Sequence, residues 1–183
     1  MSYFIPILLG TSREGRFSEK AATYIEKLLR ARGVETQLVD PRAMESEISH
    51  EKIEADDWCG TMEKADALII VTPEYNHGYP GVLKDILDSA EEECFRKPVA
   101  ICGCSSGGLG GARVVEQLRQ VMIELRMPPI REAVYFSDHK NLWNEDGSIK
   151  DPGYENRVNK MLDELLWYTQ ILKQGRETLP FPA

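Results

Sequence analysis

Apolar residues along the chain fall into short continuous runs and into longer stretches with helical periodicity. The runs at residues 4–9, 67–72 and 98–102 predict strands that are buried on both faces of a parallel sheet. Residues 34–39 alternate apolar and polar side chains, which predicts a strand nearer the edge of the sheet. Residues 130–136 are the predicted fifth strand.

Four stretches that follow a strand have the three- and four-residue spacing of amphipathic helices. Ser18 is the predicted N-cap of the first helix, and Pro80 is the predicted first residue of the second. The third helix stops at Pro128, and the fourth ends at Gly175. A further short helix is predicted within residues 51–64, inside a long polar segment.

The order of these elements predicts an α/β fold, because strands that alternate with helices form a parallel sheet with helices on both faces. Five strands fit the doubly wound order 2-1-3-4-5, in one domain that spans residues 1–183. The loops at residues 10–18, 73–79 and 103–111 each follow an apolar strand. This architecture therefore brings the three loops together at the carboxyl edge of the sheet as a single site.

The composition excludes several classes of protein. The chain has 183 residues and a formal charge of −8, which argues against general binding to nucleic acids or anionic membranes. No apolar run approaches the roughly 20 residues of a membrane helix, and no signal segment is recognisable, so a cytoplasmic location is expected. The four cysteines lack the spacing of disulfides or zinc sites, so we expect reduced thiols and no metal site.

The first loop predicts an anion site at the start of a helix, where unpaired backbone N–H groups and the helix dipole favour negative charge. It is not a nucleotide loop of the two commonest kinds. Arg16 and Phe17 replace the lysine and the hydroxyl of a P-loop, and no Gly-x-Gly follows the strand. A helix cap without a ligand is the alternative to a pocket for a terminal phosphate monoester. The residues that would grip such a phosphate are Thr11, Ser12, Arg13 and Ser18.

The other two loops have the residues expected around a flat ligand. Pro73 and Tyr75 would pack on a planar heterocycle, and the backbone of residues 74–77 would meet its polar edge. The third loop has five glycines among nine residues, which lets the main chain approach a ligand closely. It ends at a helix start, which favours developing negative charge. Each loop taken alone is also compatible with an ordinary turn.

With these loops, the chain resembles the NADPH-dependent FMN reductase family of flavodoxin-like proteins. The resemblance is carried by Gly10-Thr11-Ser12-Arg13 with Ser18, by Pro73-Glu74-Tyr75-Asn76 with residues 80–85, and by Gly103 with residues 105–111. It implies a flavodoxin-like fold and an assembly into homodimers or homotetramers. The middle motif is the most specific of the three.

The resemblance also implies a role for each loop. It assigns the FMN phosphate to Thr11, Ser12, Arg13 and Ser18. It places the isoalloxazine ring against Pro73, Glu74, Tyr75, Asn76 and His77, and the pyrimidine side of the ring against Ser105, Ser106, Gly107 and Gly108. The chain departs from the family pattern at Thr11, where serine is usual, and at Arg16, an additional basic residue. Arg16 is a candidate for the FMN phosphate, for the 2′-phosphate of NADPH, or for solvent.

The expected function is an FMN-dependent NAD(P)H oxidoreductase. Hydride would pass from NADPH or NADH through FMN to a quinone, an azo compound, a metal ion or another small acceptor. No catalytic side chain is expected, because the flavin carries the chemistry. The alternative is a flavin-binding electron carrier or redox-responsive interaction protein without substantial NAD(P)H turnover. A weaker possibility is a related domain that binds another phosphorylated ligand.

Overall fold

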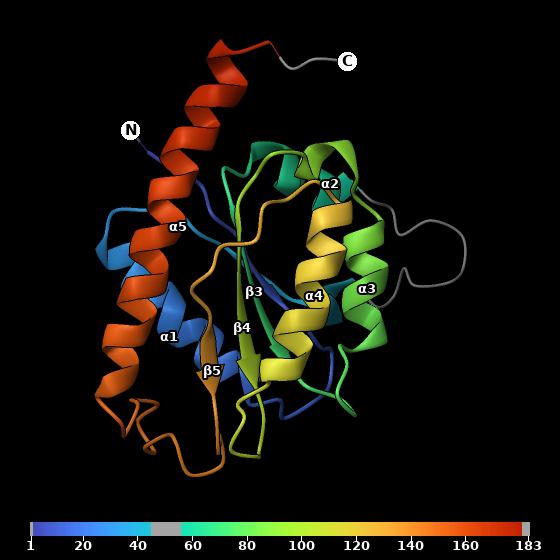
Figure 1. Cartoon of the computed structure of the whole chain (residues 1–183). Coiled ribbons are helices and arrows are strands. Elements are labelled where there is room, and N and C mark those ends of the chain that lie inside the picture. The colour runs from blue at the N-terminus through green and yellow to red at the C-terminus, as the bar shows by residue number, and fades with distance from the viewer. Residues whose placement is uncertain (1, 45–55, 181–183) are drawn as a thin grey trace.

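The parallel sheet predicted from the apolar runs is present in the computed structural model, which describes residues 2–44 and 56–180. Within these residues, five strands pair in the order β2-β1-β3-β4-β5, and the pairings are parallel (Figure 1). This confirms the predicted strand order. The strands are β1 (Ile7–Leu9), β2 (Leu38–Val39), β3 (Leu68–Pro73), β4 (Val99–Cys104) and β5 (Val134–Phe136).

Helices cover both faces of the sheet, as the alternation of elements predicts (Figure 1). On one face lie α1 (Ser18–Ala31) and α5 (Gly153–Thr178). On the other lie α2 (Asp56–Lys64), α3 (Gly81–Asp88) and α4 (Ala112–Glu124). Two short 3-10 turns, η1 (Pro41–Ala43) and η3 (Glu92–Cys94), complete the connections. The predicted short helix over 51–64 corresponds to α2, and its first five positions lie outside the described residues.

The run at residues 4–9 forms a strand only at Ile7–Leu9, and the two outermost strands are also shorter than predicted. The segment 34–39 forms a ladder only at Leu38–Val39, with a single isolated bridge between Phe4 and Glu35 before it. The segment 130–136 is a strand only from Val134. Both lie at edges of the sheet, where pairing is available on one side only, so a short ladder suffices to hold them.

Four predicted helix ends are wrong, and one of them is the end of α4, which stops at Glu124 rather than at Pro128. Phe17 occupies the N-cap of α1 and Ser18 is the first helical residue, which leaves its hydroxyl free of the capping role. Pro80 is the N-cap of α3 rather than its first residue, because its extended ψ of 144° places it outside the helix. The last helix, α5, continues through Gly175 to Thr178. One glycine costs a helix only about 1 kcal/mol, and side chains on both sides of it hold this turn.

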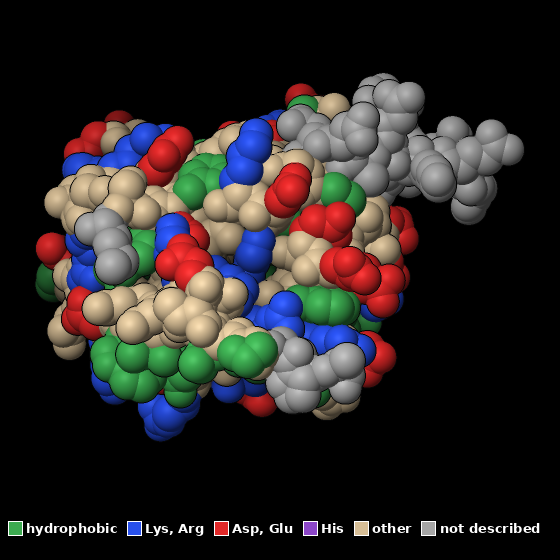
Figure 2. Space-filling model, turned by 90° about the horizontal axis from the view of Figure 1, so that it is seen from above, with side chains coloured by type: hydrophobic (Ala, Val, Ile, Leu, Met, Phe, Trp, Pro, Cys, Tyr) green, Lys and Arg blue, Asp and Glu red, His purple; other side chains and the backbone are tan. Residues whose placement is uncertain are grey.

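Those side chains meet a buried carboxylate at the amino end of the sheet. Lys173 donates to Asp66 at 3.0 Å, and Arg176 lies 3.8 Å from the same carboxylate and donates to the Arg96 carbonyl at 2.7 Å. Figure 2 shows the molecule from this end, with basic and acidic side chains interspersed on the surface. The end of α5 is therefore anchored by charge rather than by apolar packing.

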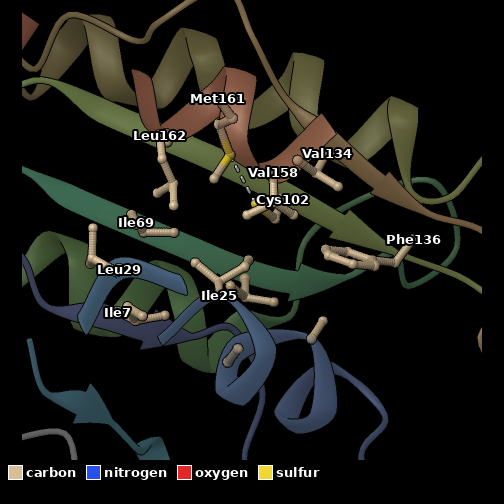
Figure 3. Close-up of a cluster of buried hydrophobic side chains, with 14 of the residues drawn as sticks. Ile7, Ile25, Leu29, Ile69, Cys102, Val134, Phe136, Val158, Met161 and Leu162 are labelled. Carbon is tan, nitrogen blue, oxygen red and sulfur yellow. Dashed lines mark hydrogen bonds between the residues drawn. The ribbon is translucent and has the colours of Figure 1, made fainter. Parts of the chain in front are cut away.

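The core is divided between the two faces of the sheet by the alternation of strand residues. In β3, Ile69 and Val71 face α1 and α5, whereas Leu68 and Ile70 face the other three helices. Figure 3 shows the buried side chains that lie between the sheet and helices α1 and α5, where Cys102 of β4 contacts Met161 of α5. Cys94, Cys102 and Cys104 are buried and form no disulfide, and burial raises the pKa of Cys102 to about 12.

No helix within residues 2–44 or 56–180 is long and apolar enough to cross a lipid bilayer.

Candidate functional site

A cleft of about 330 Å³ lies at the carboxyl edge of the sheet. Each of the three predicted loops contributes to it, as does a fourth segment that follows β5. Of the predicted site residues, Thr11, Arg13, Arg16, Ser18, Pro73, Tyr75 and Ser106 line this cleft. Ser12, Glu74, Asn76, His77, Ser105, Gly107 and Gly108 belong to the same loops but not to the lining. Contacts of these residues with a ligand stay predictions.

Arg16 holds the first loop in place. Its side chain is only 2% exposed, and it donates to the Thr11 carbonyl at 2.6 Å and to both carboxylate oxygens of Asp40 at 2.7 and 2.5 Å. Its Nε lies 3.4 Å from Glu19. Partial burial opposes the ionisation of Asp40, but hydrogen bonds from Arg16 and Arg42 outweigh it and hold the pKa of this carboxyl well below its usual range. This pairing ties the first loop to the end of β2.

Ser18 and Arg13 in the same loop have unused hydrogen-bonding capacity. Ser18 is 2% exposed, and its Oγ has no hydrogen-bond partner among the described residues. A buried hydroxyl without a partner is costly, and this one lines the cleft at the N-terminus of α1. Arg13 is exposed and has no ion-pair partner in the described part of the chain. A buried donor and a cation at a helix start fit a phosphate group.

The second loop is a tight turn that is closed by its own backbone hydrogen bonds and contacts the first loop. Tyr75 and Gly78 exchange two backbone hydrogen bonds of 2.9 Å, and the residues between them, Asn76 and His77, have positive φ angles of 50° and 71°. Two consecutive left-handed residues are the signature of a type I′ turn. The Tyr75 hydroxyl lies 3.1 Å from Thr11 Oγ1, so the first two loops contact each other inside the cleft.

Glu74 has a different role from its neighbours in the second loop. Its side chain is 5% exposed and accepts hydrogen bonds from Arg113 Nε at 2.7 Å and from the Arg113 backbone N–H at 3.2 Å. Burial opposes the ionisation of Glu74, but the contacts with Arg113 outweigh it and lower the pKa of its carboxyl. Glu74 therefore attaches the second loop to the start of α4.

The glycines of the third loop divide into two groups. A Cβ at Gly103, Gly110 or Gly111 would lie 2.7 to 2.9 Å from backbone atoms of neighbouring segments, so these glycines let β4, α4 and β5 pack closely. A Cβ at Gly107 or Gly108 would meet nothing within 4 Å. The sequence pattern thus combines a packing requirement with an open, exposed turn.

The segment after β5 was not predicted to belong to the site. The His139 N–H donates to the Ser105 carbonyl at 3.3 Å, and the His139 ring stacks on Phe17 with 4.0 Å between centroids. Burial and the charge of Lys140 lower the pKa of His139. Both His139 and Lys140 line the cleft. A usable signal was present in the sequence, because this segment also follows a strand that ends at the same edge.

The comparison with known proteins shows the family to which this chain belongs. A model of the NADPH-dependent FMN reductase family matches residues 5–141, so the chain belongs to this family. An NAD(P)H-dependent FMN reductase of Pseudomonas aeruginosa is 35% identical over 113 residues, which cover 58% of this chain and 61% of the relative. A quinone reductase of Escherichia coli is 32% identical over 130 residues, covering 64% of this chain and 68% of the relative. The match to the first relative thus spans less than two thirds of its length.

Solved structures confirm the flavodoxin-like fold. The flavoenzyme NAD(P)H:(acceptor) oxidoreductase FerB of Paracoccus denitrificans superposes with a TM-score of 0.79 at 21% identity, covering 92% of this chain and 97% of that one. A flavodoxin variant of Pseudomonas aeruginosa superposes with a TM-score of 0.57 at 18% identity, covering 91% and 99%. At such low identity these likenesses establish the fold alone.

Proposed function

We propose that this protein is an FMN-dependent NAD(P)H oxidoreductase that passes hydride from NADPH or NADH to a small acceptor such as a quinone, an azo compound or a metal ion. The observation that carries this proposal is the unpartnered, buried hydroxyl of Ser18 at the start of α1. It lines a cleft next to Arg13, where a phosphate monoester would satisfy both groups. Membership of the NADPH-dependent FMN reductase family supports FMN as the bearer of that phosphate.

The protein's contribution would be binding and orientation. FMN, when bound, supplies the redox chemistry by accepting hydride from the nicotinamide and passing electrons to the acceptor. Ser18 and Arg13 would fix the phosphate end. Tyr75 and Pro73 line the cleft beside Thr11 and would flank the ring. The open turn at Gly107 and Gly108 would leave room for a planar group next to backbone N–H donors.

The test is flavin binding followed by turnover. Purified protein is titrated with FMN and then assayed with NADPH and NADH against a benzoquinone, an azo dye and ferricyanide. We expect one FMN per chain and many turnovers of NAD(P)H per flavin with at least one acceptor. Protein that binds no added FMN would contradict the proposal.

A flavin-binding electron carrier is the second candidate. The net charge of −8 favours it, because an acidic surface steers basic partner proteins. In this case NAD(P)H would reduce the bound flavin at most stoichiometrically, without turnover in the presence of any small acceptor. The same assay therefore separates the two candidates.

A further inference from the structure

We propose that Lys140, on the segment after β5, is the second cation of the phosphate site and that the stacked pair Phe17–His139 positions it. This inference rests on the proposed function, because it assumes that FMN places its phosphate in the cleft. It assigns a binding role to a segment that lies outside the three loops through which the sequence resembles its family.

The charges in the cleft require a second cation. A phosphate monoester carries about −1.5 to −2 charges at pH 7. Arg16 is already paired with Asp40 and lies near Glu19, so it adds little net positive charge. Glu14 also lines the cleft and would repel the phosphate. Arg13 alone therefore leaves the phosphate incompletely neutralised.

Lys140 is available for this role. Lys140 and Arg13 line the same cleft, but they come from different segments of the chain. Lys140 has no ion-pair partner in the residues that the structure describes. Cations that approach a phosphate from two separate segments can contact different oxygens of the group.

The segment that bears Lys140 is fixed to two of the predicted loops. The neighbouring His139 stacks on Phe17, the residue directly before Ser18. Backbone hydrogen bonds of 3.3 Å join His139 to Ser105 and Asp138 to Gly107 in the third loop. These contacts hold the backbone of Lys140 at the cleft, so less freedom is lost when its ammonium group binds an anion.

The experiment compares FMN with riboflavin, which has the same ring and ribityl chain but no phosphate. Dissociation constants for both flavins are measured by fluorescence titration of wild type, Lys140→Gln, Lys140→Arg and Lys150→Gln. Lys150 is the matched control, because it is an exposed lysine between β5 and α5 that does not line the cleft. The dependence of FMN affinity on NaCl is measured in parallel.

We expect Lys140→Gln to weaken FMN binding about tenfold and riboflavin binding less than about twofold. Lys140→Arg should retain most of the FMN affinity, and Lys150→Gln should change neither constant by more than about twofold. The affinity of Lys140→Gln for FMN should also fall less steeply with salt than that of wild type. If Lys140→Gln leaves FMN affinity and its salt dependence unchanged, or weakens both flavins equally, the inference is wrong. Wild-type protein that binds neither flavin would instead contradict the proposed function.

Discussion

The two ends of the sheet use their cations differently. At the amino end, Lys173 and Arg176 surround the buried carboxylate of Asp66, and Lys97 donates to the carbonyls of Met62 and Glu63. Burial lowers the pKa of Lys97 to about 8. At the carboxyl end, Arg13 and Lys140 line a cleft without ion-pair partners among the described residues. Cations whose partners lie within the protein stabilise the fold, whereas cations left without one are free to bind a ligand.

Arg16 shows that position at the carboxyl edge is not sufficient for ligand binding. It lies three residues from Arg13 in the same loop, yet its side chain is buried and paired with Asp40. Two arginines that look equivalent in the sequence therefore differ in what they can contribute to an anion site. Variants at both ends of the sheet can test this distinction.

The largest effect is expected at the amino end. Asp66→Asn removes the carboxylate that two partly buried cations share, and we expect it to lower the free energy of unfolding by about 3 kcal/mol. Urea denaturation measures this. Asp163→Asn is the control, because Asp163 is 72% exposed and its pair with Arg32 should contribute less than about 1 kcal/mol. If both variants lost the same free energy of unfolding, the buried ion pair would stabilise the fold no more than the exposed one.

Asp40→Asn is expected to have a smaller effect with a characteristic pH dependence. At neutral pH it should cost about 2–3 kcal/mol, because it leaves the buried Arg16 without its closest partner. The pKa of Asp40 in the folded protein lies below its ordinary value of 3.8. The stabilisation is therefore present above pH 4 and is lost as the pH falls through the folded-state pKa. Urea titrations from pH 7 to pH 3 should show a constant difference between wild type and variant down to about pH 4 and a smaller difference below it. A difference that does not change over this range would contradict the pairing.

Arg13→Gln should change the free energy of unfolding least, by less than about 0.5 kcal/mol, because the side chain is exposed and unpaired in the described residues. Its FMN affinity should nevertheless fall about tenfold, with riboflavin affinity nearly unchanged. Thermal unfolding and fluorescence titration measure the two quantities. A destabilised variant with normal FMN affinity would reverse the roles assigned to Arg13 and Arg16.

Much of the fold followed from the sequence, because buried strands and amphipathic helices leave strong periodic patterns. The strand order and the meeting of three loops at one edge needed no tertiary information beyond the rules for parallel sheets. Helix ends were wrong by one residue at Ser18 and Pro80, because the N-cap residue of each helix makes no side-chain hydrogen bond that the sequence could signal.

The site was harder to predict in detail, because the sequence does not show which partner a polar residue finds. Asp40 pairs with Arg16 across 24 positions, and this depends on the parallel pairing of β1 and β2. The packing role of Gly110 depends on the approach of Tyr135, 25 positions away. The contribution of His139 depends on its stacking on Phe17, which lies 122 positions away in the sequence. The local sequence pattern around these residues does not predict any of these contacts.

A crystal structure of the complex with FMN tests the central claim most directly, because that claim concerns where the phosphate lies. We predict that a phosphate oxygen accepts a hydrogen bond from the Ser18 hydroxyl and that the phosphate lies within contact of Arg13, while Arg16 remains paired with Asp40. A complex in which the phosphate lies elsewhere and the Ser18 hydroxyl is still without a partner would contradict the account.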